Sequence, residues 1–289
     1  MSKGFLWFLV SVLIVANVLV FYRLGYAQQQ KNQNITSNSV SDSLTQTPIS
    51  NKVVAKYSVA VPILMYHYIR DYTDQTDPIG IGLSVSPVNF QKQLEAIKSA
   101  GYHTISLEDF AAHKYGTKPI ILTFDDGYDD QFTDAFPILQ QEGMTGTFFI
   151  VKNFVDQPLY MTSWQIGQLK AAGMEIGGHT IDHKDMATQT YDNAYKEISG
   201  GQKGRDPVFA YPSGKYSPST VLITESLGIK AVVTTELGIA TDLSNLQLLP
   251  RVRMKNTTDV IKLINDQLYL LDHPTPPAAI PTTTPVTGG

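Results

Sequence analysis

The chain has 289 residues, which is enough for one large α/β domain with terminal extensions or for two small domains. Acidic residues outnumber basic residues by 26 to 22, so the overall charge gives no indication of a nucleic-acid partner. The absence of cysteine excludes disulfide bonds and thiolate zinc sites. Histidine and carboxylate side chains are therefore the candidate ligands for any metal ion.

An apolar segment lies close to the N-terminus. Phe5 to Phe21 form a run of 17 residues that is apolar with two exceptions, and Tyr22-Arg23 follow it. A signal peptide core has about 7 to 15 residues and a membrane helix roughly 17 to 25, so the length favours a single-pass membrane anchor. The alternative is a signal peptide cleaved near Gly25-Tyr26-Ala27. In both cases we expect the rest of the chain to lie outside the cytoplasm, at the cell membrane or secreted.

Composition divides the remainder of the chain into three parts. Residues 28–58 are rich in Gln, Asn, Ser and Thr, as in a flexible linker. Residues 274–289 are rich in Pro and Thr and indicate a disordered tail. The predicted organisation is a membrane anchor or signal over 1–27, the linker over 28–58, one folded domain over 59–273 and the tail over 274–289.

Apolar strand patterns alternate with helical patterns through the predicted domain. Strands are predicted at 62–66, 119–124, 146–151, 174–178, 207–211, 230–234 and 248–252, and helices near 90–101, 132–141, 164–172, 191–200, 220–227 and 260–270. Repeated βα units with continuously apolar strands indicate a parallel sheet that is buried on both faces. Their number favours an α/β barrel, with an open doubly wound sheet as the alternative.

Aspartate or histidine residues directly follow three of these strands. His67 follows the first strand, Asp125 and Asp126 follow the second, and His179 and His183 follow the fourth. Active sites form at the carboxyl ends of parallel strands. We therefore expect these five side chains to meet at one rim of the sheet.

The residue types predict a metal-dependent hydrolase. One carboxylate of Asp125-Asp126 can bind a cation together with His179 and His183, while the other remains free to accept a proton from water. Four-residue spacing would place both histidines on one face of a helical turn, and Gly177-Gly178 would bring the backbone close to a ligand. The alternatives are a simple Asp-Gly turn and two partly exposed histidines at a helix start.

Two ordered motifs carry a family resemblance. Thr123-Phe124-Asp125-Asp126-Gly127, followed by His179-Thr180-Ile181-Asp182-His183, resembles the polysaccharide deacetylase family, also called the NodB-homology or carbohydrate esterase 4 family. The resemblance covers roughly residues 60 to 255. It implies a distorted (β/α) barrel and the removal of N-acetyl groups from chitin-like or peptidoglycan polymers, or of O-acetyl groups from xylan. It also implies that Asp125 is the general base and that Asp126, His179 and His183 bind a divalent metal, usually Zn²⁺.

A third motif of the family is altered in this chain. The matching segment is Phe209 to Gly214, where Ala210 and Ser213 replace the arginine and tyrosine of the family pattern. The resemblance implies that the Ser213 backbone N–H helps to hold the oxyanion, because that function requires loop geometry more than side-chain identity. The lost arginine normally orients the base. Arg251 or Arg253 could replace it, although a surface ion pair is the alternative for both.

The general acid is expected at the N-terminal end of the domain. No convincing Leu-His strand is present near the C-terminus, whereas Ile63 to His67 form an apolar strand that ends in histidine. This order resembles the circularly permuted branch of the family, which includes poly-N-acetylglucosamine deacetylases. His67 is then the general acid, and the alternative is a core histidine beside the sheet.

These observations together predict a metal-dependent N-deacetylase that acts on an N-acetylglucosamine-containing polysaccharide at the cell surface. An acetylated glycan and, through the N-terminal helix, the membrane are the expected partners, and no protein partner is implied. Two other functions remain possible for the same fold: a catalytically silent glycan-binding module, which the changes at Ala210 and Ser213 allow, and a glycan O-acetyl esterase.

Overall fold

The computed structural model describes residues 56–274. The predicted anchor or signal, residues 28–55 of the linker and residues 275–289 lie outside the described residues, so these assignments and the location outside the cytoplasm stay predictions. Over 56–274, none of the helices combines the length and the apolar character that a membrane span needs.

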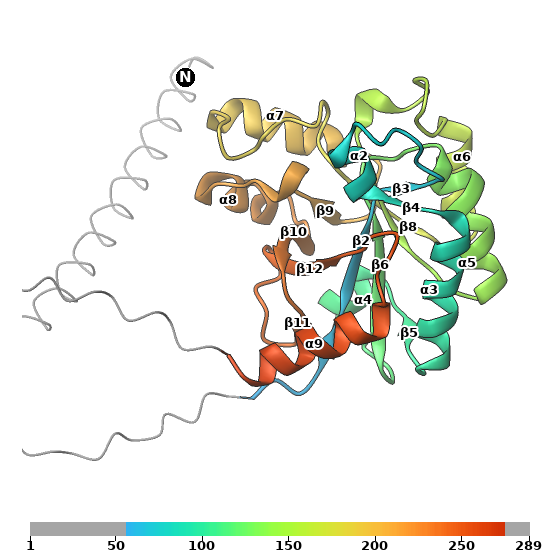
Figure 1. The fold of residues 1–289 in the computed structure, drawn as a ribbon. Coiled ribbons are helices and arrows are strands. Elements are labelled where there is room, and N and C mark those ends of the chain that lie inside the picture. The colour runs from blue at the N-terminus through green and yellow to red at the C-terminus, as the bar shows by residue number, and fades with distance from the viewer. Residues whose placement is uncertain (1–55, 275–289) are drawn as a thin grey trace, which may run out of the picture. The chain divides into compact units, whose positions relative to one another are not determined.

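A closed parallel barrel forms the centre of the described domain (Figure 1). Its seven strands are β2 (Ile63–Tyr66), β6 (Pro119–Phe124), β7 (Thr147–Ile150), β8 (Glu175–Gly178), β9 (Val208–Ala210), β10 (Ala231–Leu237) and β12 (Leu249–Arg253). Their order in space is β2-β12-β10-β9-β8-β7-β6, and the pairing of β2 with β6 closes the ring. The α/β barrel is therefore confirmed, and the open sheet is excluded.

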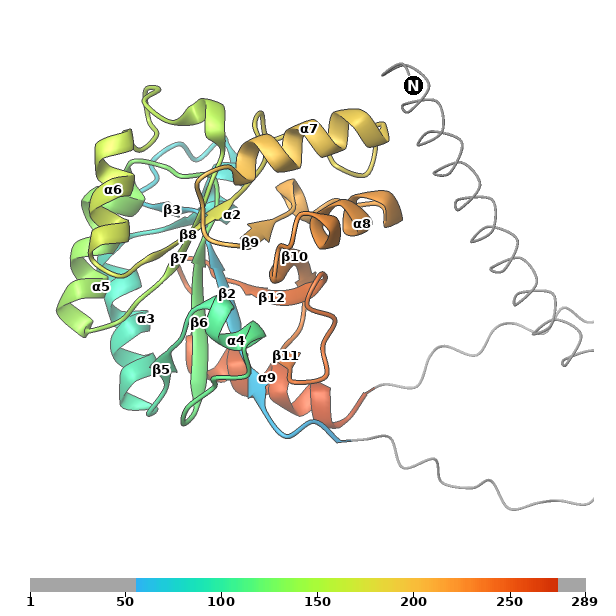
Figure 2. The same ribbon diagram turned by 180° about the vertical axis from the view of Figure 1, so that it is seen from behind.

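Helices cover the outside of the barrel. On one side lie α3 (Pro87–Ser99), α5 (Phe136–Glu142) and α6 (Ser163–Ala171), and on another lie α7 (Tyr191–Gln202) and α8 (Pro218–Ser226), as Figures 1 and 2 show from opposite directions. The remaining helices are α2 (Pro78–Leu83), α4 (Leu107–Ala111) and α9 (Val260–Asp272). A π-helical turn, η1 (Gln131–Ala135), precedes α5. Two 3-10 turns, η2 (Lys152–Phe154) and η3 (Pro212–Gly214), complete the helical elements.

Short elements escaped the sequence prediction. They are α2, α4, β5 (His103–Thr104), which pairs with the start of β6, and two small pairs: β1 (Ala60–Val61) with β11 (Ala240–Thr241), and β3 (Tyr68–Ile69) with β4 (Ser84–Val85). Segments of two to six residues are too short to show a hydrophobic period. The helical patterns that were predicted all correspond to helices, with boundaries that differ by a few residues.

Alternate residues of most barrel strands enter two different apolar clusters. Leu64 and Leu122 pack outward with residues of α3, α5 and α9, whereas Ile63 and Ile121 pack with the facing residues of other strands. This alternation follows from the two-residue period of a strand in a sheet that is covered on both faces. Arg251 is two residues from Leu249, a member of the second cluster, so it shares the inward face of β12.

The glycine pair at the end of β8 has a packing role. A Cβ on Gly177 would lie 2.6 Å from the Phe149 ring and 2.9 Å from the Val208 carbonyl oxygen, and a Cβ on Gly178 would lie 2.5 Å from the Gln202 side chain. The prediction that these glycines bring the backbone close to a ligand stays a prediction. They are required because neighbouring strands and α7 pack tightly against β8.

Candidate active site

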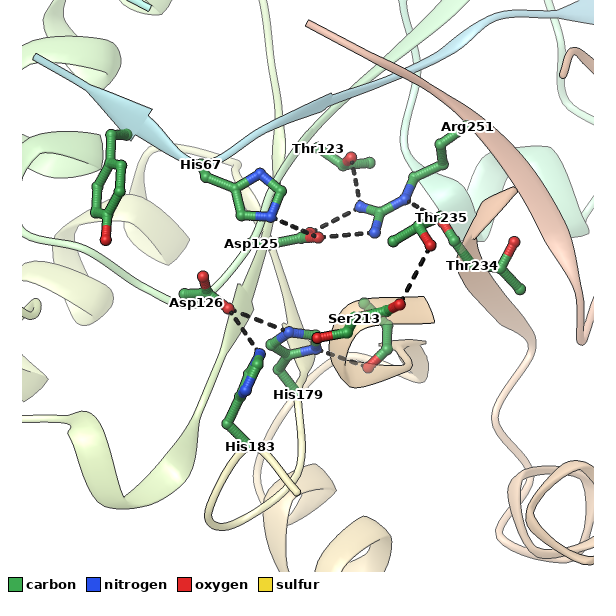
Figure 3. A network of polar contacts seen from close by, with 12 residues as sticks. His67, Thr123, Asp125, Asp126, His179, His183, Ser213, Thr234, Thr235 and Arg251 are labelled. Atoms are coloured by element: carbon green, nitrogen blue, oxygen red, sulfur yellow. Dashed lines mark hydrogen bonds and ion pairs between the residues drawn. The ribbon is translucent and has the colours of Figure 1, made fainter. Parts of the chain in front are cut away.

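The residues predicted to bind the metal, transfer protons or hold the oxyanion all line one hollow at the carboxyl ends of the barrel strands. They are His67, Asp125, Asp126, His179, His183 and Ser213. The volume of the hollow is about 460 Å³, and it is lined by His67, Tyr68, Ile79, Leu83, Asp125, Asp126, Tyr128, His179, His183, Ser213, Thr235 and Arg253. Figure 3 shows the polar side chains of this hollow turned toward one another from different strands. Residues that are distant in sequence are thus brought to one rim, as the positions of the strands predicted.

Three electron-pair donors meet on one side of the hollow. Asp126 Oδ1 lies 3.3 Å from His179 Nε2 and 3.2 Å from His183 Nε2, and the three ligand atoms lie within 4.8 Å of one another. Asp126 Oδ1 is buried without a hydrogen-bond partner among the described residues. A divalent cation bound between these atoms would satisfy all three, so the residues fit the predicted metal site.

The tautomer of His179 suits metal binding. His179 is buried, and its Nδ1 lies 2.7 Å from the carbonyl oxygen of Ala210, which can only accept a hydrogen bond. Nδ1 therefore carries the proton, and Nε2 presents a lone pair to the site. Ala210, which stands where the family pattern has arginine, acts here through its backbone and holds the ligand ring.

The loop that carries the two histidines is not helical. Thr180 and His183 have φ values of 67° and 55°, and the Thr180 hydroxyl accepts a hydrogen bond from the His183 backbone N–H at 2.9 Å. The expectation of a shared face of a helical turn is therefore wrong. Left-handed residues turn the chain back on itself after β8, and both rings reach Asp126 because of this turn.

Glu197 on α7 stabilises this loop through hydrogen bonds to its backbone. Its buried carboxylate accepts hydrogen bonds from the backbone N–H groups of Ile181 and Asp182, both at 3.0 Å, and pairs with Lys184 Nζ at 2.5 Å. No sequence motif indicated this role, because Glu197 lies in an ordinary amphipathic helix.

Asp125 is held by a buried arginine. The two terminal nitrogens of Arg251 donate to the two carboxylate oxygens of Asp125, each at 2.7 Å, and Arg251 Nε donates to the Thr234 carbonyl at 2.7 Å. Thr123 accepts a further hydrogen bond from Arg251 at 3.0 Å. Of the two arginines considered in the sequence, Arg251 thus takes the orienting position, and it is 1% exposed rather than on the surface.

The pKa directions follow from this arrangement. Burial alone would raise the pKa of Asp125, but the Arg251 guanidinium outweighs it and holds that pKa below its usual value. Burial also opposes the charged form of Asp126, yet the two imidazoles keep its pKa well below the usual range. Both carboxylates are therefore ionised at neutral pH.

His67 lies on the opposite side of Asp125 from the arginine. Its Nε2 is 3.8 Å from Asp125 Oδ2, and burial lowers the pKa of the ring, partly offset by the nearby carboxylates. Gln131 in the π-helical turn donates to the backbone carbonyls of both His67 and Asp125, at 2.9 and 2.5 Å. Gln131 therefore ties the ends of β2 and β6 together, a function that the sequence did not indicate.

Ser213 completes the rim. It has a φ of 54°, and no hydrogen bond from its backbone N–H is found within residues 56–274. Gly214 follows with a φ of 70°, and a Cβ there would lie 2.1 Å from the Thr235 hydroxyl. The glycine of the altered third motif is thus required so that this loop can lie against β10, and the Ser213 N–H stays available to a ligand.

Two tyrosines that the sequence did not single out form an aromatic wall. Tyr68 and Tyr128 line the hollow with ring centroids 4.2 Å apart, and the Arg70 guanidinium lies 4.3 Å from the Tyr68 centroid. The nearby aromatic residues Phe154, Tyr160, Trp164 and Tyr216 are not among the residues that line it. Aromatic contact with a sugar in this hollow would therefore involve Tyr68 and Tyr128.

A parallel barrel with an Asp-His-His cluster, an arginine-held carboxylate and a facing histidine defines a metal-dependent hydrolase. The sequence profile of the family described as polysaccharide deacetylase matches residues 112–232. His67, directly after the first strand of the barrel, and Arg251, on the last strand, lie outside that match, as expected for the permuted branch.

Individual relatives agree with this class. YxkH of Bacillus subtilis (strain 168), whose name describes it as a candidate polysaccharide deacetylase, is 30% identical over 206 residues, covering 67% of this chain and 71% of that protein. The Streptococcus pyogenes deacetylase PplD in complex with acetate has 28% identity and a TM-score of 0.66, over 72% of this chain and 98% of that structure. The Escherichia coli (strain K12) poly-β-1,6-N-acetyl-D-glucosamine N-deacetylase is 24% identical, over 60% of this chain and 34% of that protein. The chain belongs to the polysaccharide deacetylase family and is a polysaccharide deacetylase of the carbohydrate esterase 4 type.

Removal of the buried arginine should destabilise the fold. Arg251→Gln leaves the Asp125 carboxylate buried without its counter-ion, so the free energy of unfolding should fall by about 3–5 kcal/mol. The double variant Asp125→Asn/Arg251→Gln should lose clearly less than the sum of the two single variants, because no charge is then left unpaired. Urea unfolding of the four proteins measures this coupling, and strictly additive losses would contradict a buried pair.

Neutralising Glu197 should weaken metal binding. Glu197→Gln keeps the side-chain volume, but when its amide oxygen accepts from the two backbone N–H groups its amide nitrogen faces the Lys184 ammonium group, so the histidine loop should loosen and the metal dissociation constant rise about tenfold. Calorimetric titration with Zn²⁺ or Co²⁺ measures the effect. The matched control is Glu225→Gln, an exposed glutamate on α8. Equal metal affinity in both variants would show that Glu197 does not position the ligands.

Proposed function

We propose that this protein removes N-acetyl groups from a polysaccharide that contains N-acetylglucosamine. The observation that carries the proposal is the position of Asp125 between the Arg251 guanidinium, at 2.7 Å, and His67, at 3.8 Å, beside the Asp126-His179-His183 cluster. The relatives named above include an N-deacetylase of a polymer of N-acetylglucosamine, which supports the same substrate class.

The proposed metal is Zn²⁺, bound by Asp126, His179 and His183, because two imidazoles and one carboxylate suit this ion and leave positions open to water and substrate. When bound, such a cation would acidify water and polarise the acetamide carbonyl. Asp125, held in the ionised form by Arg251, is then the base that accepts the proton from the attacking water.

The other residues of the rim act on the substrate. The backbone N–H of Ser213 donates to the carbonyl oxygen as negative charge develops on it. His67 donates a proton to the nitrogen of the departing sugar amine, which is a poor leaving group unless protonated. The products are acetate and a glucosamine unit, so the polymer gains positive charge.

Acetate release from defined glycans tests the reaction and separates the base from the metal ligands. With Zn²⁺ or Co²⁺, the full chain should release acetate from N-acetylated chitooligosaccharides. Asp125→Asn should keep bound metal but lose about 10²–10⁴-fold in kcat. Asp126→Ala, His179→Ala and His183→Ala should lose the metal itself, measured by elemental analysis. Release only from O-acetyl esters would indicate an esterase, and none with any metal would indicate a binding module. Retained turnover in Asp125→Asn would exclude it as the base.

The assignment of His67 as the acid predicts a dependence on the leaving group. His67→Ala should slow cleavage of the sugar amide much more than cleavage of an acetate ester whose leaving group needs no proton, such as p-nitrophenyl acetate. The ratio of the two kcat/KM values measures this effect. An equal loss on both substrates would mean that His67 has a structural role only.

A further inference from the structure

A second hollow adjoins the active site and contains an excess of positive charge. Its volume is about 540 Å³, and it is lined by Thr235, Leu237, Arg251, Arg253, Lys255, Thr258, Asp259, Lys262, Leu263 and Asp266. Thr235 and Arg253 also line the active-site hollow. The two spaces are therefore neighbours that share one wall, formed by the ends of β10 and β12.

Most charged groups of this second hollow already have partners. Arg251 pairs with Asp125, and Lys262 pairs with Asp266 at 2.6 Å. The Asp259 side chain accepts a hydrogen bond from the Lys262 backbone N–H and caps the N-terminus of α9. Ion pairs therefore engage Asp266 and two of the four cations, while Asp259 accepts a hydrogen bond only from a backbone N–H group.

Arg253 and Lys255 are the two cations that remain. Within residues 56–274, no ion pair or hydrogen bond engages the Arg253 guanidinium or the Lys255 ammonium group. Lys255 is exposed and Arg253 is half-buried, and no Arg253 nitrogen is among the buried atoms without a partner, so a ligand from solvent can reach both cations. That arrangement is expected where the partner comes from a ligand.

The strand explains where Arg253 points. Arg251 and Arg253 are two residues apart on β12 and thus share its inward face, with Arg253 one step nearer the rim. Arg253 is paired in register with Met65, two residues before His67. Asp125 already has two hydrogen bonds from Arg251, so a second arginine is not needed to orient the base.

We propose that Arg253 and Lys255 form a subsite for an anionic group, a carboxylate or a phosphate, on a sugar next to the one that is deacetylated. The shared wall places the subsite within reach of a neighbouring sugar unit, and the guanidinium fork matches both anions. This inference rests on the proposed deacetylase function and narrows its substrate to an acetylated glycan that carries negative charge.

The experiment compares three tetrasaccharides of N-acetylglucosamine: the neutral tetramer, one oxidised to carboxylates at C6, and one phosphorylated at C6. With the full chain and metal, kcat/KM for acetate release should be about 10- to 100-fold higher for at least one anionic tetramer, as expected for a hydrogen bond between charged groups. The anionic tetramer with the higher kcat/KM shows whether the subsite prefers a carboxylate or a phosphate. The preference should decrease as NaCl is raised from 50 to 500 mM.

Variants assign the preference to residues. Arg253→Gln should remove most of the ratio of anionic to neutral kcat/KM, Arg253→Lys should restore part of it, and Lys255→Gln should reduce it severalfold. Lys196→Gln, which removes one exposed positive charge from α7, should leave the ratio unchanged. An equal loss by Arg253→Gln on neutral and anionic tetramers would show that Arg253 acts on the catalytic groups and would overturn the subsite.

Failure of the subsite and failure of the deacetylase function are distinguishable. Equal kcat/KM for all three tetramers refutes the anionic subsite while the deacetylase function stands. If no tetramer releases acetate, the proposed deacetylase function is refuted. The dissociation constants of the same three tetramers, measured by calorimetry, then test the anionic subsite independently. Preferential binding of an anionic tetramer that Arg253→Gln abolishes supports it, and equal binding of all three overturns it.

Discussion

The parallel pairing of β2 with β6 is the interaction on which the rest of the site depends. It matches Tyr66 with Phe124, so His67 and Asp125 follow the two strands at the same height. The same pairing leaves the other edge of β2 to β12, which brings Arg251 to the inner face of the barrel. The proposed base, the proposed acid and the arginine that pairs with the base therefore come together because the first barrel strand lies between the second and the last.

Four of the eight non-glycine residues with positive φ among residues 56–274 lie where the chemistry is proposed. Asp126, Thr180, His183 and Ser213 all have positive φ values between 54° and 76°. Such residues cost of order 1–3 kcal/mol each, and they persist only where the surroundings determine them. Here Glu197, the Thr180 hydroxyl and the contact of Gly214 with β10 supply those surroundings. The rim is thus held open in a shape that favourable local conformation alone would not give.

The sequence predicted the barrel and the ligand set because both leave local signals. Apolar strands alternate with amphipathic helices, and Asp126, His179 and His183 lie in short motifs at strand ends. Arg251 and Arg253 could not be distinguished, since both lie on the same face of one strand and only their depth in the barrel separates them. Gln131 and Glu197 act through tertiary contacts alone. The helical turn expected between the histidines was wrong because spacing does not reveal a left-handed residue such as Thr180.

The division of the site between the two ends of the domain also has a consequence for biosynthesis. Every proposed metal ligand precedes residue 184, whereas the counter-ion of the base arrives only with β12, the last strand of the barrel. A nascent or truncated chain that ends before Leu249 would still contain all three ligands, but its catalytic aspartate would lack the group that orients it. The proposed metal ligands are therefore synthesised well before the arginine that pairs with Asp125, and the complete site awaits nearly complete synthesis of the domain.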